Sequence, residues 1–136
     1  MNVELRVRAA ARDAIVADAR EAVPAECCGL LLGREDEIVE ARPARNIADQ
    51  PASRFLIDPH DHIEGRREAR ARGLEVVGFY HSHPRSSSEP SARDLDEFSY
   101  PGHVYAIVSL HGEPAEVSLF RFEAGNCQRV SFVTVG

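Results

Sequence analysis

The chain has 136 residues, of which 43% are hydrophobic and 28% are charged. This composition supports a buried core and excludes the low hydrophobicity of disordered chains. The formal net charge of −6 and the sequence pI near 5.5 argue against nucleic-acid binding, because such surfaces usually carry a basic excess. We therefore expect a single domain over residues 1–136 that does not bind nucleic acid.

No segment approaches the roughly 20 apolar residues that span a bilayer, and residues 1–12 carry charges throughout, unlike a signal peptide. The cysteines are odd in number and two of them are adjacent, namely Cys27, Cys28 and Cys127. This is a poor basis for a disulfide framework, so we expect a cytoplasmic protein with reduced thiols and no membrane partner. Adjacent strand residues point to opposite faces, so we interpret Cys27 and Cys28 as core thiols rather than joint metal ligands.

A helix and a hairpin are predicted in the N-terminal part of the chain. Apolar residues recur at helical spacing from Arg8 to Val23, which predicts an amphipathic helix that ends at Pro24. The apolar run from Cys28 to Gly33 is followed by a polar turn and by the β-like segment Glu37 to Ala41. This pattern is typical of a hairpin.

A loop and a second helix follow the hairpin. The segment Pro43 to Ser53 contains two Pro, an Asn and an Asp, which predicts an irregular loop that leads into the short run Arg54 to Ile57. Asp58 can cap the next helix and Pro59 suits its first position. Gly73 can adopt the left-handed conformation that ends a helix.

Strands dominate the remainder. A strand rich in Val, Phe and Tyr is predicted from Leu74 to His81, and Ser91 is a candidate cap for a short helix that runs to about Phe98. Three more strands are predicted, over His103 to Leu110, Ala115 to Phe122 and Cys127 to Val135. Together these elements predict an α+β (or α/β) domain with a mixed, largely antiparallel sheet and two main helices packed on it.

The segment from His81 to Asp94 carries the residues best suited to catalysis. His83 follows His81 by two residues, so extended backbone would project both imidazoles to one side. The short loop before Ser91 can fold the next helical turn, with Asp94, back beside the histidines. Two histidines and a carboxylate with one open position are typical ligands of catalytic zinc. The same residues also fit a capping box, Ser91-x-x-Asp94, beside two surface imidazoles.

A resemblance to a known family favours the metal site. The string His81-Ser82-His83-Pro84, followed after six residues by Ser91 and then by Asp94, resembles the complete signature of the JAMM (MPN-plus) metalloproteases. Other segments resemble the compact bacterial form of this family, so that the likeness covers nearly the whole chain: Pro24 to Gly33, Phe55 to Pro59, Val77 to Tyr80 and Tyr105 to Ser109.

The resemblance implies a fold, a cofactor and a set of residue roles. The implied fold is the MPN fold, which is similar to that of cytidine deaminases. His81, His83 and Asp94 would bind Zn2+. Glu26 would be the base that activates the zinc-bound water, and Ser91 would steady the oxyanion. The chemistry is consistent, because zinc lowers the pKa of its water toward ~7 while a carboxylate takes the proton and a hydroxyl stabilises the oxyanion.

Other candidate residues fit less well. Glu21 could rival Glu26 as the base, but it lies inside the predicted helix and outside the matching motif. A zinc deaminase would need a Pro-Cys-x-x-Cys motif, which the sequence lacks. The remaining histidines lie in polar or turn-like contexts, and we interpret them as surface residues: His60, His62, His103 and His111.

The resemblance also implies a substrate class. Compact bacterial relatives cleave after the C-terminal Gly-Gly of small ubiquitin-like sulfur-carrier proteins, whereas larger relatives remove ubiquitin with the help of a long insertion. The run from Asp94 to Tyr105 is too short for that insertion, so we expect a zinc-dependent peptidase or isopeptidase for a sulfur-carrier protein. Three alternatives remain: a ubiquitin-type isopeptidase, a non-catalytic MPN scaffold, and a peptidoglycan or phage-tail-type peptidase.

Overall fold

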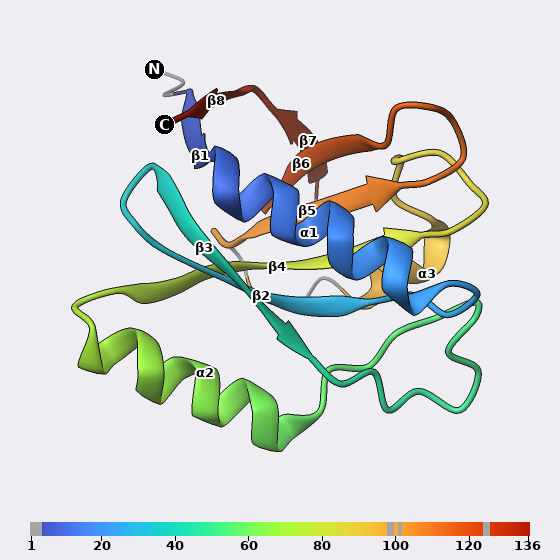
Figure 1. Ribbon diagram of the computed structural model, residues 1–136, viewed down its shortest axis with the longest axis horizontal. Helices are drawn as coiled ribbons and strands as arrows, with labels where there is room; N and C mark the ends of the chain where they lie inside the picture. The colour runs from blue at the N-terminus through green and yellow to red at the C-terminus, as the bar shows by residue number, and fades with distance from the viewer. Residues whose placement is uncertain (1–3, 98–99, 101, 124–125) are drawn as a thin grey trace.

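The computed structural model describes residues 4–97, 100, 102–123 and 126–136 (Figure 1). The elements in chain order are β1 Leu5–Arg8, α1 Ala9–Ala22, β2 Cys28–Arg34, β3 Glu37–Ala44, α2 Pro59–Ala71, β4 Glu75–His83, α3 Ala92–Glu97, β5 Val104–Ser109, β6 Glu116–Glu123, β7 Asn126–Val130 and β8 Phe132–Val135. The helix predicted from Arg8 to Val23 and the hairpin that follows it are therefore confirmed.

The strands form one eight-stranded sheet in the order β7-β6-β5-β4-β2-β3-β1-β8. Antiparallel pairs join β2 to β3 and β4, and β6 to β5 and β7. Parallel pairs join β1 to β3 and β8, and β4 to β5. The predicted mixed, largely antiparallel sheet in an α+β domain is confirmed.

The central strand β2 is buried on both faces. Leu31 packs in the cluster that contains Ile15 of α1, whereas Leu30 and Leu32 pack on the opposite face with Ala69 of α2. This division follows from the alternation of side chains along a strand. The unbroken apolar run of β2 therefore separates two core layers, and Figure 1 shows α1 lying across the sheet on one of these faces.

The ends of α2 match the expected capping chemistry. The Asp58 side chain accepts a hydrogen bond from the backbone nitrogen of His60 at 2.8 Å, and Pro59 is the first helical residue. Gly73 follows the helix at φ +72°, a conformation that glycine adopts at little cost. Within the helix, a Cβ on Gly65 would lie 2.1 Å from Cδ1 of Leu30, so this glycine allows the close approach of α2 to β2.

The segment between β3 and α2 is mostly irregular, as predicted. Strand β3 extends to Ala44, which takes in the first residues of the predicted loop. Of the short run expected from Arg54 to Ile57, only Ile57 pairs with another strand-like residue, through an isolated bridge to Asn46. The loop is thereby closed at its base and lies beside the end of β4 that carries the histidines.

The prediction of one continuous strand from Cys127 to Val135 is wrong. The chain breaks at Ser131 into β7, which pairs with β6, and β8, which pairs with β1. These two strands lie at opposite ends of the sheet order, yet one residue separates them in sequence. Because consecutive Cα atoms are about 3.8 Å apart, the sheet must curl until its two edges meet. The backbone nitrogen of Leu5 also donates to the Ser131 carbonyl at 3.1 Å.

Strand β1 was not predicted, although its residues alternate between buried and exposed positions. Leu5 and Val7 are buried in the α1 cluster, and the arginines between and after them face outward. Four residues are too few to establish a period against the charged surroundings. In the described part of the chain, the helices lack the length and apolar character needed to cross a bilayer.

The short helix predicted to run from Ser91 to about Phe98 is present as α3, but Phe98 itself lies outside the described residues.

Candidate active site

Strand β4 delivers two imidazoles to one face of the sheet. His81 and His83 are the last odd-numbered residues of β4, and their side chains are 1% and 5% exposed. Their Nε2 atoms lie 3.3 Å apart. Ser82 points to the other face, where its hydroxyl accepts a hydrogen bond from the backbone nitrogen of Cys27 at 2.8 Å. The extended geometry expected for the His-x-His pair is therefore present.

Asp94 joins the two histidines from the first turn of α3. One carboxylate oxygen lies 3.1 Å from Nε2 of His81, and the other lies 2.9 Å from Nε2 of His83. The predicted capping box is also present, because the Asp94 backbone nitrogen donates to the Ser91 hydroxyl at 3.0 Å and the Ser91 nitrogen donates to the Asp94 carboxylate at 2.9 Å. The two interpretations of the sequence are thus compatible, and the cap aims the carboxylate at the histidines.

The tautomer of His83 is determined by its second nitrogen. Nδ1 lies 2.6 Å from the carbonyl oxygen of Ser87, and a carbonyl can only accept a hydrogen bond. Nδ1 is therefore the donor, so Nε2 of the neutral ring presents a lone pair toward the Asp94 carboxylate. Two acceptors 2.9 Å apart need a cation between them, which is either a proton on the imidazole or a metal ion.

The three side chains suit a tetrahedral metal ion. One ligand atom from each of His81, His83 and Asp94 can be chosen so that all lie within 4.8 Å of one another, and all three residues are buried. Ligand atoms of a tetrahedral zinc site lie about 3.3–3.5 Å apart, since each is about 2.0–2.2 Å from the ion. The two Nε2 atoms lie 3.3 Å apart, and each lies 3.1 or 2.9 Å from one of the two carboxylate oxygens of Asp94. These distances are close to that range, and the donor set is typical of catalytic zinc.

Opposing effects act on the protonation of this cluster. Burial alone would lower the pKa of His83, but its hydrogen bonds to Asp94 and the Ser87 carbonyl raise it overall. Burial alone would raise the pKa of Asp94, but its hydrogen bonds with His81 and His83 lower it far below its ordinary value. The carboxylate is therefore held ionised, as a metal ligand must be.

Glu26 lies beside the same cluster. In the antiparallel pairing of β2 with β4, Cys28 lies opposite His81. The same register places Cys27 opposite Ser82, and the Cys27 carbonyl accepts a hydrogen bond from the Ser82 nitrogen at 3.1 Å. One step further, this antiparallel register brings Glu26 next to His83, and the Glu26 charge contributes to the raised pKa of that histidine. Glu26 is 8% exposed. The rival base Glu21 is exposed on the last turn of α1.

Asn46, whose role was not predicted from the sequence, holds the backbone of Glu26 in place. Its side-chain nitrogen donates to the carbonyls of Glu26 and Arg54 at 3.0 and 3.1 Å. Its side-chain oxygen accepts from the nitrogens of Ala48 and Leu56, both at 3.0 Å. The loop before α2 is thus fastened to the chain that carries the candidate base. A single Asn in an irregular loop gave no sign of this role.

Buried serines fasten the loop between β4 and α3. The Ser88 side chain is 1% exposed and donates to Glu116 of β6 at 2.6 Å. The Ser109 hydroxyl of β5 donates to the Ser86 carbonyl at 2.5 Å. These contacts hold the Ser87 carbonyl against His83 and hold α3 near the end of β4. The composition of the loop predicted its irregular backbone but not these anchors.

Two further side chains, Ser91 and Phe55, lie beside the cluster. Ser91 is exposed, and its oxygen accepts the Asp94 amide, so the hydroxyl proton remains to be donated elsewhere. Phe55 stacks on the His81 ring with centroids 4.3 Å apart and an interplanar angle of 19°. This aromatic contact, also missed from the sequence, comes from the loop before α2.

The other histidines divide into two pairs. His60 and His111 are exposed, as expected. The expectation is wrong for His62 and His103, which are half-buried because the phase of α2 and the start of β5 turn both toward Phe79. The ring centroids of these two histidines lie 5.4 and 5.8 Å from that of Phe79.

The adjacent cysteines lie in the interior, as expected. Cys27 belongs to the core cluster that contains α1, and the Cys28 thiol lies 3.7 Å from the carbonyls of Ala44 and Arg45. Burial raises the pKa of Cys27 well above its ordinary value and raises the pKa of Cys28 to about 12. All three cysteines of the chain are free thiols, and Cys127 is the least buried of them.

Comparison with known proteins covers the whole candidate site. Residues 8–123 match the Prok-JAB family, which comprises prokaryotic homologs of the JAB domain. The desampylase of Haloferax volcanii is 40% identical over 114 residues, which are 79% of this chain and 82% of that protein. The CysO-cysteine peptidase of Mycobacterium bovis is 31% identical over 109 residues, which are 77% of this chain and 73% of that protein.

Solved structures agree with the fold. A JAB1/MPN domain protein from Archaeoglobus fulgidus superimposes with a TM-score of 0.65 at 22% identity, covering 97% of this chain and 100% of that chain. A structure described as JAMM, a metalloprotease-like zinc site in the proteasome and signalosome, gives a TM-score of 0.60 at 23% identity, covering 96% and 99% of the two chains. At these identities the likeness establishes the fold alone, and the expected MPN fold is confirmed.

Proposed function

The chain belongs to the prokaryotic JAB family of JAMM-type peptidases, and from this premise we propose that it is a zinc-dependent isopeptidase. In this proposal it hydrolyses the bond after the C-terminal Gly-Gly of a small ubiquitin-like sulfur-carrier protein. The observation that carries the proposal is the convergence of His81, His83 and Asp94, from β4 and α3, on one buried point. Glu26 lies next to that point on the chain before β2.

His81, His83 and Asp94 would hold the zinc ion. When bound, the ion would supply a Lewis acid that polarises the scissile carbonyl and favours ionisation of a water molecule near neutral pH. The protein contributes the orientation of the ligands. The Ser87 carbonyl holds Nδ1 of His83 at 2.6 Å, and the Ser91 amide holds the Asp94 carboxylate at 2.9 Å. Such supporting hydrogen bonds fix ring orientation and typically matter 10–100-fold to metal affinity or activity.

Glu26 would act as the general base. Its carboxylate would accept a proton from the attacking water and pass it to the departing amine, which cannot leave as an anion. Its place beside the three ligand side chains suits this role, because a general base must lie within hydrogen-bond reach of the proton that it accepts. Asn46 would keep the Glu26 backbone fixed during that transfer, through the 3.0 Å bond to the Glu26 carbonyl.

Ser91 would stabilise the oxyanion that forms on the scissile carbonyl. Its oxygen is held by the Asp94 amide, which leaves the hydroxyl proton to be aimed at a substrate. A donor already oriented before the reaction needs no reorganisation as negative charge develops. The exposed position of Ser91 at the edge of the buried cluster is where a substrate carbonyl would arrive.

The substrate class rests on the relatives and on the small size of the site. The similar proteins include a desampylase and a CysO-cysteine peptidase. Helix α3 ends at Glu97 and β5 begins at Val104, so the connection between them cannot hold a long substrate-clamping insertion. Glycines suit such a site, because a chain without Cβ atoms can approach the ligands closely.

Intact-mass spectrometry tests the proposal. The zinc-loaded protein is incubated with a sulfur-carrier protein whose terminal Gly-Gly is extended by cysteine or by a short peptide, and in parallel with Lys-linked di-ubiquitin. We expect the carrier to lose the extension after its last glycine. Efficient cleavage of di-ubiquitin with an untouched carrier would replace the substrate assignment. Stoichiometric zinc with no cleavage of either protein would favour the non-catalytic scaffold.

A further inference from the structure

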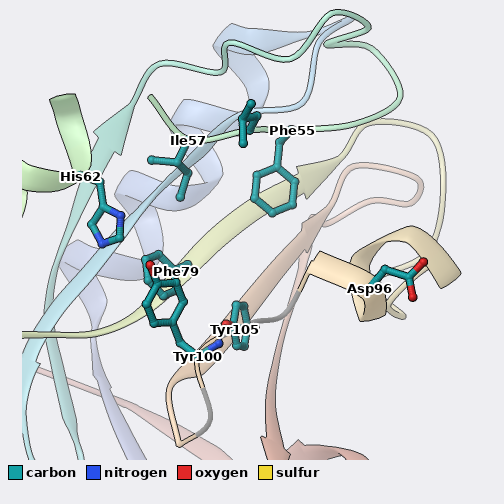
Figure 2. A pocket seen from close by; sticks show the side chains of 8 residues that line it. Phe55, Ile57, His62, Phe79, Asp96, Tyr100 and Tyr105 are labelled. Carbon is teal, nitrogen blue, oxygen red and sulfur yellow. Dashed lines mark hydrogen bonds between the residues drawn. The ribbon is translucent and has the colours of Figure 1, made fainter. Parts of the chain in front are cut away.

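A pocket of about 390 Å³ is lined by side chains from the loop before α2 and from the strands β4 and β5, among others (Figure 2). Most of its walls are apolar or aromatic, formed by Phe55, Leu56, Ile57, Phe79, Tyr100 and Tyr105, and the polar lining comes from His62 and Asp96. Phe55 and Ile57 belong to the loop before α2, whereas Phe79 and Tyr105 belong to β4 and β5. The proposed reaction uses none of these side chains.

The pocket is continuous with the candidate metal site through two residues. Phe55 lines the pocket and also stacks on His81, with ring centroids 4.3 Å apart. Phe79 precedes His81 by two residues in β4, so both side chains lie on the same face. Their positions along the strand differ by about 6.6 Å. The pocket therefore adjoins the candidate metal site, on the same face of β4 and about two residues before His81.

The walls are preorganised. The rings of Tyr100 and Tyr105 lie with centroids 5.1 and 5.7 Å from that of Phe79. The Tyr105 hydroxyl accepts a hydrogen bond from the Tyr100 nitrogen at 2.9 Å, so part of the polar surface is already used within the protein. Leu56 and Tyr100 are nevertheless 55% and 40% exposed. An apolar group of a ligand that covers this exposed apolar surface would remove it from water, which is favourable.

We infer that this pocket binds the apolar side chain of the residue immediately before the Gly-Gly of the substrate, and that it selects substrates by this residue. The inference rests on the proposed function. An extended chain advances about 6.6–6.8 Å over two residues and returns its side chain to the same side. With the carbonyl of the last glycine at the metal ligands, the residue two positions earlier falls at the level of Phe79. An acidic side chain there is disfavoured, because the pocket would remove its hydration and because the carboxylate of Asp96 lines the same pocket.

Carrier variants and pocket variants test the inference by kinetics. The zinc-loaded enzyme is assayed on one carrier with tails Leu-Gly-Gly and Asp-Gly-Gly, each followed by the same extension. We expect kcat/KM to favour the Leu tail by about 10–200-fold. Tyr100→Ala and Leu56→Lys should remove most of this preference by raising KM for the Leu tail. Val133→Ala, which changes an exposed apolar residue on β8, is the matched control and should change neither substrate.

A binding measurement keeps the inference testable without turnover. Synthetic octapeptides ending in Leu-Gly-Gly and Asp-Gly-Gly are titrated into the zinc-loaded Glu26→Gln protein by calorimetry. We expect tighter binding of the Leu peptide, and loss of the difference when Tyr100→Ala is added. Preference in binding without cleavage of any carrier would support the pocket while contradicting the proposed function.

Three results would overturn the inference. The first is cleavage of both tails at equal kcat/KM, which would leave the proposed function standing. The second is equal affinity of the two octapeptides. The third is that Tyr100→Ala and Leu56→Lys change sedimentation of the protein rather than tail preference, which would make the pocket a contact between copies of this chain.

Discussion

Nε2 of His83 lies 2.9 Å from the carboxylate of Asp94, although the two residues are eleven positions apart in the sequence. The contact joins the end of β4 to the first turn of α3. It depends on the serine anchors of the intervening loop and on the capping box at Ser91. A helix cap, which in most proteins only satisfies backbone amides, here also presents a carboxylate to two buried imidazoles.

Glu26→Gln should retain the metal and the fold but lose turnover by about 10²–10⁴-fold, because an amide cannot accept the proton of water. Steady-state cleavage of the extended carrier measures the loss, and elemental analysis checks the metal. Glu21→Gln is the matched control, since Glu21 is exposed on α1. Turnover near the wild-type rate in metal-loaded Glu26→Gln would show that another group is the base.

Ser91→Ala should lower kcat by about 10²–10³-fold, as expected for the loss of one oxyanion donor. It should also lower the free energy of unfolding by about 0.5–2 kcal/mol, because the cap of α3 is lost. Ser91→Thr keeps both the hydroxyl and the cap and should restore most of both quantities. If Ser91→Ala loses stability while kcat is unchanged, the residue is a cap and nothing more.

The metal-free protein should be more heat-stable at pH 6 than at pH 8.5. The pKa of His83 is raised in the folded chain above its ordinary value of 6.5, because the ring is hydrogen-bonded to Asp94 and to the Ser87 carbonyl. The contribution of protonated His83 to stability is therefore fully present below about pH 6.5 and is lost as pH rises through the raised pKa. Zinc acts in the opposite direction, because its ligands must be deprotonated. The melting temperature of the chelator-treated protein measures this, and an equal pH dependence in His83→Gln would contradict it.

Thiol labelling at pH 8 should distinguish the cysteines. The pKa of Cys28 is raised to about 12, so only about one molecule in 10⁴ carries the reactive thiolate, and Cys27 is equally shielded. In the native protein, iodoacetamide should modify Cys127 alone, and all three should react after unfolding. Mass spectrometry of the digested protein identifies the labelled cysteines, and Cys127→Ser is the control, which should take up no label in the native state. Native labelling of Cys27 or Cys28 at the rate of Cys127 would refute their burial.

Local patterns in the sequence predicted the parts of the site that lie close together in the chain. The alternation in His81-x-His83 and the capping spacing of Ser91-x-x-Asp94 each depend on backbone geometry within a few residues. Asn46 and Phe55 could not be predicted in this way. Each acts on a residue more than 15 positions away. Asn46 lies in a loop whose composition indicates only irregular backbone, and Phe55 lies in the short run that follows it.

The fold shows the same division between local and distant determinants. The ends of α2 follow from Asp58, Pro59 and Gly73, which act within one turn. The break at Ser131 and the pairing of β8 with β1 depend on the curl of the whole sheet. No Gly or Pro lies between Cys127 and Val135, so none of the residues that usually mark a turn predicts that break.

The most direct test of the account is anomalous diffraction from crystals of the zinc-loaded protein, recorded on both sides of the zinc absorption edge. We predict one strong peak, about 2.0–2.2 Å from Nε2 of His81, Nε2 of His83 and a carboxylate oxygen of Asp94. The peak should vanish in His83→Ala and persist in His111→Ala, which changes an exposed histidine. A zinc peak that remains in His83→Ala, or that lies away from these three side chains, would contradict the assignment of His81, His83 and Asp94 as the zinc ligands.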